Sequence, residues 1–316
     1  NEVRSEDKKV DIDIYVGKRR IAPFVHPKKG SQTVERIGYK TESYEPPQVA
    51  PDMITTAEDL QKRSIGENIY NAADPDTRAA HQLGKDMAEL DDMITRREEV
   101  MCSEALFSGQ VTVEGEGYSD IVQYWSQLGA PSQPFLALGA GDRWNESTAD
   151  IAGNFRGARL DIIQKSGVSP RDAILGRDAL DALLSNEAFV KQLDNRRIDT
   201  GAIDPQMLPD GVTYWGYLKD SALDIWTYDE WYLDPADNTE KPIVPEKKVL
   251  VGSQSVRTSM MYGCVVDVEK GSFALPRVPV SFIMRKPQAG RVLQMMAKPL
   301  PVIHQIYGFK VLEVLA

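Results

Sequence analysis

The stretch at residues 260–269, MMYGCVVDVE, places Cys264 directly after a glycine and before two valines. A cysteine on a tight turn can act as a nucleophile if a base, usually a histidine, takes the proton from its thiol. The chain contains three histidines, His26, His81 and His304, and none is a sequence neighbour of this cysteine. The local sequence therefore offers the thiol no base.

Strand alternation gives Cys264 a structural role instead. A strand through this stretch would place Cys264, Val266 and Val268 on one face. Free cysteine is among the most buried residue types, so we expect a packed core residue. The sequence also lacks CxxC, HxxxH and HExxH metal motifs, a phosphate-binding loop and a Gly-x-Ser-x-Gly elbow. We predict no catalytic residues, no metal site and no cofactor.

A second candidate is the acidic and aromatic stretch LDIWTYDEWYLDPADNTE. Asp224, Asp229 and Glu230 stand among aromatic residues that include Trp226 and Trp231. Paired carboxyl groups beside aromatic platforms suit a protein that binds or cleaves carbohydrate. The same letters also fit strands joined by the DPADN turn, because aromatic residues favour strands. The sequence favours this structural interpretation and keeps a carbohydrate-active protein as an alternative.

Charge and composition exclude several classes of function. The 316 residues include 37 Lys and Arg against 47 Asp and Glu, a net charge of 37 − 47 = −10. The short runs GKRR and PKK are too small for the basic stripe that tight nucleic-acid binding needs. No apolar run reaches the roughly 18 residues of a membrane span. Two distant cysteines argue against a disulfide framework and fit a reducing compartment.

The clearest predicted element is a helix over residues 75–107. Asp74 can cap it, Pro75 suits the first helical position, and apolar residues recur every three or four positions. At about 1.5 Å per residue the helix would be roughly 50 Å long. A weaker helix is predicted over Ser147–Lys165, and strands dominate after residue 212. This order of elements indicates the α+β class.

The proline-punctuated stretch from residue 31 to residue 56 is predicted to form a long two-stranded arm. It carries few large apolar residues, and a free hairpin is marginal in water. Ordering such an extension costs conformational entropy that contacts with other copies must offset. A long helix, an arm and no catalytic set are typical of a subunit of a protein shell.

Several segments, taken in order, resemble the phage lambda-type major capsid proteins, the E-type coat protein family. They are RIAPFVHPKKGSQTVERIGYKTESYEPPQVAP, LDNRR, DIWTYDEWYLDPADN, KVLVGSQSVRTSMMYGCVVD and MMAKPLPVIHQIYGFKVLEVLA. The likeness covers roughly residues 15–316. It places Cys264 in a strand motif of the family after Tyr262 and Gly263, which supports its structural role.

The resemblance implies the Hong Kong 97 capsid fold. It suggests an incomplete N-terminal arm and first strand at 1–29, an extended E-loop hairpin at 30–73 and a peripheral domain at 74–167 with its spine helix at 75–107. An axial domain at 168–285 and closing strands at 286–316 would follow. Seven residues are candidate contacts between subunits: Lys28, Lys29, Arg36, Tyr39, Tyr44, Arg196 and Arg197.

The resemblance also implies a function. Coat subunits of this kind assemble as pentamers and hexamers into an icosahedral shell around double-stranded DNA, which they do not bind specifically. Expected partners are other copies, scaffold, portal and a decoration protein, with assembly in the host cytoplasm and no membrane. No Lys–Asn isopeptide cross-link is predicted. An encapsulin-like compartment shell is the alternative within the same fold.

Overall fold

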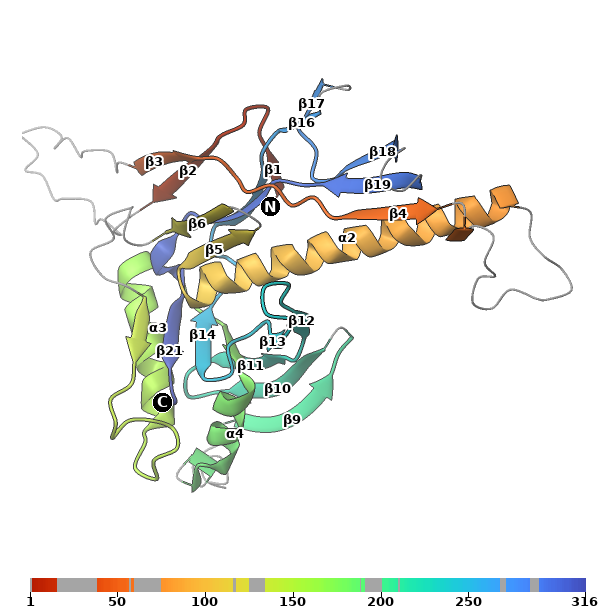
Figure 1. The fold of residues 1–316 in the computed structure, drawn as a ribbon. Helices are drawn as coiled ribbons and strands as arrows, with labels where there is room; N and C mark the ends of the chain where they lie inside the picture. Colours follow the sequence, from red (N-terminus) through yellow and green to blue (C-terminus); the bar gives the residue numbers. More distant parts are fainter. Residues whose placement is uncertain are drawn as a thin grey trace, which may run out of the picture. The chain divides into compact units, whose positions relative to one another are not determined.

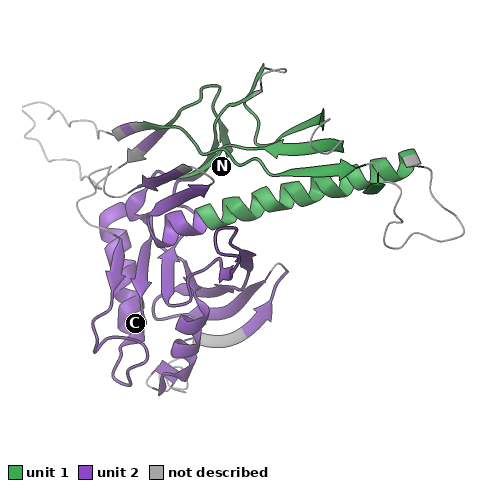
Figure 2. Ribbon diagram, in the orientation of Figure 1, with its two compact units in different colours: residues 1–11, 43–101, 259–302 green, residues 12–42, 102–258, 303–316 purple. Residues whose placement is uncertain are grey.

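The computed structural model describes most of the chain. The described residues are 2–15, 39–56, 58–59, 75–115, 118–124, 134–187, 189–190, 201–209, 211–267, 271–284 and 290–316. They divide between two compact units, coloured separately in Figure 2. Unit 1 comprises residues 1–11, 43–101 and 259–302, and unit 2 comprises residues 12–42, 102–258 and 303–316.

A few helices stand among many short strands, as Figure 1 shows, and the predicted α+β class is confirmed. The helices are α2 (Pro75–Phe107), α3 (Ile151–Ser166), α4 (Arg177–Ser185) and the 3-10 turn η1 (Ile306–Gly308). The strands are β1 (Glu2–Arg4), β2 (Val10–Tyr15), β3 (Tyr39–Tyr44), β4 (Asp52–Thr56), β5 (Gln110–Gly115), β6 (Tyr118–Gln123), β7 (Phe135–Ala137), β8 (Asp172–Leu175), β9 (Gly201–Met207), β10 (Val212–Leu218), β11 (Leu223–Tyr228), β12 (Trp231–Leu233), β13 (Glu240–Pro242), β14 (Lys248–Gly252), β15 (Thr258–Tyr262), β16 (Val265–Asp267), β17 (Gly271–Phe273), β18 (Val278–Met284), β19 (Gly290–Met296), β20 (Pro299–Ile303) and β21 (Lys310–Glu313).

Unit 2 is built on a seven-stranded sheet with the order β7-β21-β14-β8-β11-β10-β9. Alternate residues of its strands point to opposite faces. On β11, Leu223 and Ile225 are buried against one face, where they join the core residues of α3 and α4. That core includes Trp144, Phe155, Ile162, Leu183, Leu175, Val249, Val251 and Leu312. Both helices therefore cover the same face of the sheet.

The bounds of α3 follow from local capping. The Asp150 carboxylate accepts a hydrogen bond of 2.8 Å from the backbone N–H of Gly153, which satisfies one of the free donors at the helix start. Gly167 ends the helix in the left-handed conformation with φ of 76°. The helix predicted from Ser147 thus begins later, at Ile151, because Asp150 is the residue that caps it.

In unit 1, α2 packs against the three-stranded sheet β18-β19-β4. Leu90 and Ile94 are fully buried and meet Leu293 and Met295 of β19. The predicted helix over 75–107 is confirmed at both ends. Met87, one of the recurring apolar residues of this segment, is exposed.

The prediction that residues 31–56 form an arm paired with itself is wrong for the described strands. β3 pairs with β2, and β4 pairs with β19 in unit 1, with Thr56 opposite Gly290. The two-stranded ribbon is therefore β2–β3, and polar side chains link it: the Thr41 hydroxyl donates to the Asp13 carboxylate at 2.5 Å. The sequence identified the strands but not their partners, because pairing between distant segments depends on packing.

Candidate functional site

Cys264 lies in the short connection between β15 and β16 and is buried. Its backbone N–H donates to the carbonyl of Asp7 at 3.3 Å, and its thiol lies 3.7 Å from the carbonyl of Val265. Val265 is fully buried whereas Val266 is half exposed, so the prediction that Cys264 and Val266 share a face is wrong. The strand begins after the cysteine, which shifts the alternation by one residue. The expected burial of the thiol is confirmed.

The acidic and aromatic residues of the second candidate separate onto different elements. Asp224 and Trp226 lie on β11 in the seven-stranded sheet, whereas Trp231 begins β12, which pairs with β13. Tyrosine hydroxyls donate to two of the carboxylates: Tyr214 to Asp224 at 2.9 Å, and Tyr228 to Glu230. Within the described residues, no group of three or more His, Cys, Asp or Glu side chains is placed to hold a metal ion.

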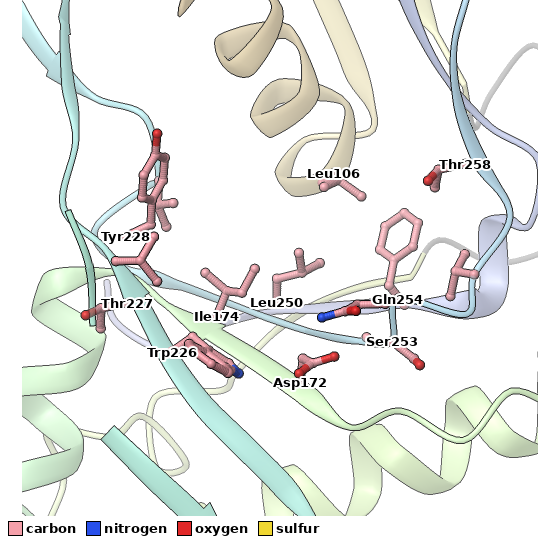
Figure 3. Close-up of a pocket in the computed structure, with 15 residues that line it drawn as sticks. Leu106, Asp172, Ile174, Trp226, Thr227, Tyr228, Leu250, Ser253, Gln254 and Thr258 are labelled. Carbon is pink, nitrogen blue, oxygen red and sulfur yellow. The ribbon is translucent and has the colours of Figure 1, made fainter. Parts of the chain in front are cut away.

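A cavity of about 580 Å³ opens on the face of the unit 2 sheet that α3 and α4 leave free. Figure 3 shows Leu106 from the end of α2 above Ile174 and Leu250, with Trp226 and Asp172 on the opposite side. The lining is mostly apolar, with a few polar groups near the acid. A volume of this size falls within the range of about 300–1,000 Å³ found for ligand pockets. A mostly apolar lining suits the binding of an apolar group better than catalysis.

Asp172 lines this cavity, and a second carboxyl group lies on the adjacent strand. Asp172 of β8 is the register partner of Asp224 on the parallel neighbour β11. Burial raises the pKa of Asp172 above its ordinary value, and the negative charge of Asp224 adds to this effect. Hydrogen bonds from Trp226 and from the backbone of Gln254, with the charge of Arg171, partly offset the rise. An added cation would stabilise the ionised form of Asp172.

Unit 1 contains a different polar cluster, centred on Arg277. Its guanidinium makes two hydrogen bonds to the Glu98 carboxylate, at 2.6 and 3.0 Å, and a third to Asp91 at 2.8 Å. Burial, together with the charge of Glu98, raises the pKa of Tyr262 to about 12. The cluster ties α2 to the segment that precedes β18 and has the geometry of a structural clamp.

Most of the predicted contact residues lie outside the described residues. These are Lys28, Lys29, Arg36, Arg196 and Arg197. Tyr39 begins β3 and Tyr44 ends it, in the two-stranded ribbon with β2. Their role in contacts between subunits stays a prediction. The sequence analysis did not single out Asp172. The available signal is the alternation of Asp224 and Trp226 with buried residues on β11, which places polar and aromatic side chains on the second face of the sheet.

A comparison with models of protein families shows which family the chain belongs to. The family model described as phage major capsid protein E matches residues 1–309. This chain belongs to that family. It is 22% identical over 306 residues to the major capsid protein of Escherichia phage lambda, covering 93% of this chain and 86% of that protein. It is also 22% identical over 317 residues to the P21 prophage-derived major head protein of Escherichia coli O6:H1 strain CFT073, covering 99% and 91%.

Solved structures agree on the fold of this capsid protein. A crystal structure assigned to a prophage capsid protein from E. coli CFT073 has a TM-score of 0.72 at 19% identity and covers 99% of this chain and 90% of that chain. The capsid of a native GTA particle has a TM-score of 0.52 at 12% identity, covering 100% and 88%. The fold is of the Hong Kong 97 type, as the resemblance to the coat protein family implied.

Family membership makes this chain a phage major capsid protein, a structural protein rather than a member of an enzyme class. The described helices include none with the length and apolar character needed to cross a membrane. The buried thiol and the dispersed carboxylates agree with a structural role. The cavity on the sheet of unit 2 is then a candidate surface for contacts rather than for catalysis.

Proposed function

We propose that this capsid protein self-assembles as pentamers and hexamers into an icosahedral shell that encloses double-stranded phage DNA. The family match over residues 1–309 is the observation that carries the proposal. The β2–β3 ribbon adds physical support, because it is a two-stranded sheet whose polar side chains Asp11, Asp13, Thr41 and Ser43 are exposed. Val10 and Ile12 of β2 are buried within the subunit, so the exposed polar face is the one left for contacts with another copy.

The charge of the chain suits a container for DNA. A net charge of −10 on every copy repels a polyanion, so packaged DNA would stay mobile inside the shell instead of adhering to it. We infer that other copies are the main partners, with scaffold, portal and a decoration protein as further partners, and that assembly takes place in the host cytoplasm. The proposed N-terminal arm, peripheral domain and axial domain keep the bounds predicted above, whereas β4, within the proposed E-loop at 30–73, pairs with β19 of unit 1.

Negative-stain microscopy of the purified full chain tests the proposal. We expect closed spherical particles, with five-fold and six-fold rings of subunits in images of partly disassembled material. Nuclease treatment of particles recovered from infected or induced cells should leave an enclosed DNA fraction intact. Open filaments, amorphous aggregates or isolated subunits over the whole range of salt and protein concentration would contradict the proposal.

A further inference from the structure

The β12–β13 hairpin of unit 2 presents an apolar face. Trp231 is 43% exposed and Leu233 is 60% exposed, and both point to the same side because they lie two positions apart on β12. On β13, Pro242 lies opposite Trp231 and Glu240 lies opposite Leu233. Side chains of opposite residues share a face of an antiparallel pair. This face therefore consists of two large apolar side chains, a proline and one acid.

Two other acids of the hairpin are already engaged. Lys241 lies on the opposite face, and its ammonium group contacts the carboxylates of Asp234 at 2.6 Å and Asp237 at 2.9 Å. Glu240 is exposed and, among the described residues, makes no ion pair. The hairpin thus offers an aliphatic side chain, Leu233, beside a carboxylate that is available to a partner.

Unit 1 has an apolar surface at the end of β18. Phe282 and Ile283 are exposed, at 46% and 71%, and Met284 after them is half-buried. A run of three apolar residues that water reaches is unfavourable unless it serves a contact. β18 is also an edge strand of its sheet, and an exposed apolar edge favours contact with another chain. This end of the sheet therefore has the properties of a surface that another protein covers.

A cation accompanies Ile283 on this surface. Arg291 of β19 is the register partner of Ile283, so the two side chains share a face of the sheet. Further along the same face, Leu293 and Met295 are buried in the core with α2, whereas Arg291 is exposed. Within the part of the chain that the structure describes, no carboxylate lies within ion-pair distance of the Arg291 guanidinium. Ile283 and Arg291 are thus an aliphatic side chain beside an unpaired cation.

The two surfaces match in composition and are opposite in charge. Each contains a cross-strand pair of one aliphatic and one charged residue, Leu233 with Glu240 and Ile283 with Arg291. Contact would remove both aliphatic side chains from water and pair a carboxylate with a guanidinium, which binds carboxylates through two parallel hydrogen bonds. Either surface packed against itself would instead bring like charges together. The complementarity therefore selects the other surface of a second copy of this chain.

We propose that the Leu233 and Glu240 pair of one copy packs against the Ile283 and Arg291 pair of another copy. The inference rests on the proposed shell and assigns one of its contacts. Because two different surfaces meet, each copy uses one surface toward the copy before it and the other toward the copy after it. A contact repeated head to tail in this way closes into a ring when the rotation permits.

Reversing the two charges tests the contact. Arg291→Glu and Glu240→Arg each place like charges across it, and each should raise the concentration of full chain needed for assembly by at least about tenfold. The double variant Arg291→Glu/Glu240→Arg restores opposite charges with their positions exchanged, so it should assemble close to the wild-type concentration. Light scattering measures the onset of assembly, and circular dichroism checks that each variant is folded. Single variants that assemble as the wild type does, or a double variant as defective as the single ones, would overturn the contact.

Arg177→Glu is the matched control. Arg177 is exposed at the start of α4 in unit 2, and the variant carries the same change of charge as Arg291→Glu. The chain Arg177→Glu/Glu240→Arg has the net charge of the wild type and should stay as defective as Glu240→Arg alone. Its recovery to the wild-type level would show that net charge rather than pairing with Arg291 controls assembly, and would overturn the assignment.

Added cysteines provide a second readout. Leu233→Cys and Ile283→Cys chains, mixed under assembly conditions and treated with a short bismaleimide, should yield a covalent dimer above the background that Cys102 and Cys264 give in the wild type. A chain that carries both substitutions, kept below its assembly concentration, should give no cross-link within one chain. An efficient internal cross-link would overturn the assignment to a contact between copies.

Microscopy of the wild type separates this inference from the proposed function. Closed shells that the two single charge-reversal variants form as readily as the wild type overturn the contact and leave the proposed shell standing. A cross-link between Leu233→Cys and Ile283→Cys chains in material that never forms closed particles supports the contact and contradicts the proposed shell.

Discussion

Replacing Arg277 with leucine would remove the two hydrogen bonds that the guanidinium donates to Glu98 and the one to Asp91. The side chain of Glu98 is 12% exposed and that of Arg277 is 22% exposed, whereas that of Asp91 is 54% exposed. The loss therefore falls mainly on Glu98, whose carboxylate would stay largely buried without its cation. The Asp91 bond is close to a surface ion pair.

The magnitude follows from this difference in burial. Removing one partner of a buried ion pair costs about 3–5 kcal/mol, and the partial exposure of Arg277 places it at the lower end. The exposed bond to Asp91 adds about 0.2–1 kcal/mol. We expect Arg277→Leu to lower the free energy of unfolding by about 3 kcal/mol. Glu98→Gln should recover part of this loss in the double variant, because the amide carries no charge to leave unpaired.

Urea unfolding of the unassembled subunit, followed by circular dichroism, measures the effect. The four chains of the cycle are the wild type, Arg277→Leu, Glu98→Gln and the double variant. We expect a coupling energy of about 1.5–3 kcal/mol, as for hydrogen bonds to charged groups. The exposed Arg291 on β19 is the control, and Arg291→Leu should change stability by no more than about 0.5 kcal/mol. A coupling energy near zero would refute the interpretation of the cluster as a clamp.

Three further predictions concern single groups. Burial raises the pKa of Asp172 above 3.8, so the wild type loses stability as the pH rises and this carboxyl group ionises. Asp172→Asn should therefore gain stability relative to the wild type between acid and neutral pH. A difference in urea midpoints that stays constant with pH would contradict this. The pKa of Tyr262 is raised from 10.0 to about 12, so the wild type should lose more stability than Tyr262→Phe as the pH rises through this window. In an absorbance titration of the tyrosine hydroxyls, the step near pH 12 should be absent from Tyr262→Phe. A Cβ at Gly176 would lie 2.2 Å from the carbonyl oxygen of Pro245, so Gly176→Ala should cost at least about 2 kcal/mol in urea unfolding, whereas Gly141→Ala, with no atom within 4 Å, should be nearly neutral.

Local signals predicted α2 well, and pairing between distant segments was the main failure. Pro75 at the helix start and an apolar period of three to four residues specify α2 within its own sequence. β4 pairs with β19, more than two hundred residues away, and no local signal distinguishes this partner from β3. The strand itself was visible, but its pairing depends on the core that α2 and β19 form together.

The cavity was missed for the same reason. Its lining joins Leu106, Asp172, Trp226, Leu250 and Phe309, which come from five separate elements or connections of unit 2. The sequence marked Trp226 as notable, favoured a strand for it, and considered only its neighbouring acids in the alternative of a carbohydrate site. The structure places Trp226 beside Asp172 of another strand, and only the sheet register brings these two together.

The mass of the purified full chain in solution, measured by multi-angle light scattering across a series of salt and protein concentrations, tests the shell most directly. We expect a megadalton species of narrow size distribution in equilibrium with small rings or subunits. A single species that stays at the 35.2 kDa of one chain under every condition would contradict it.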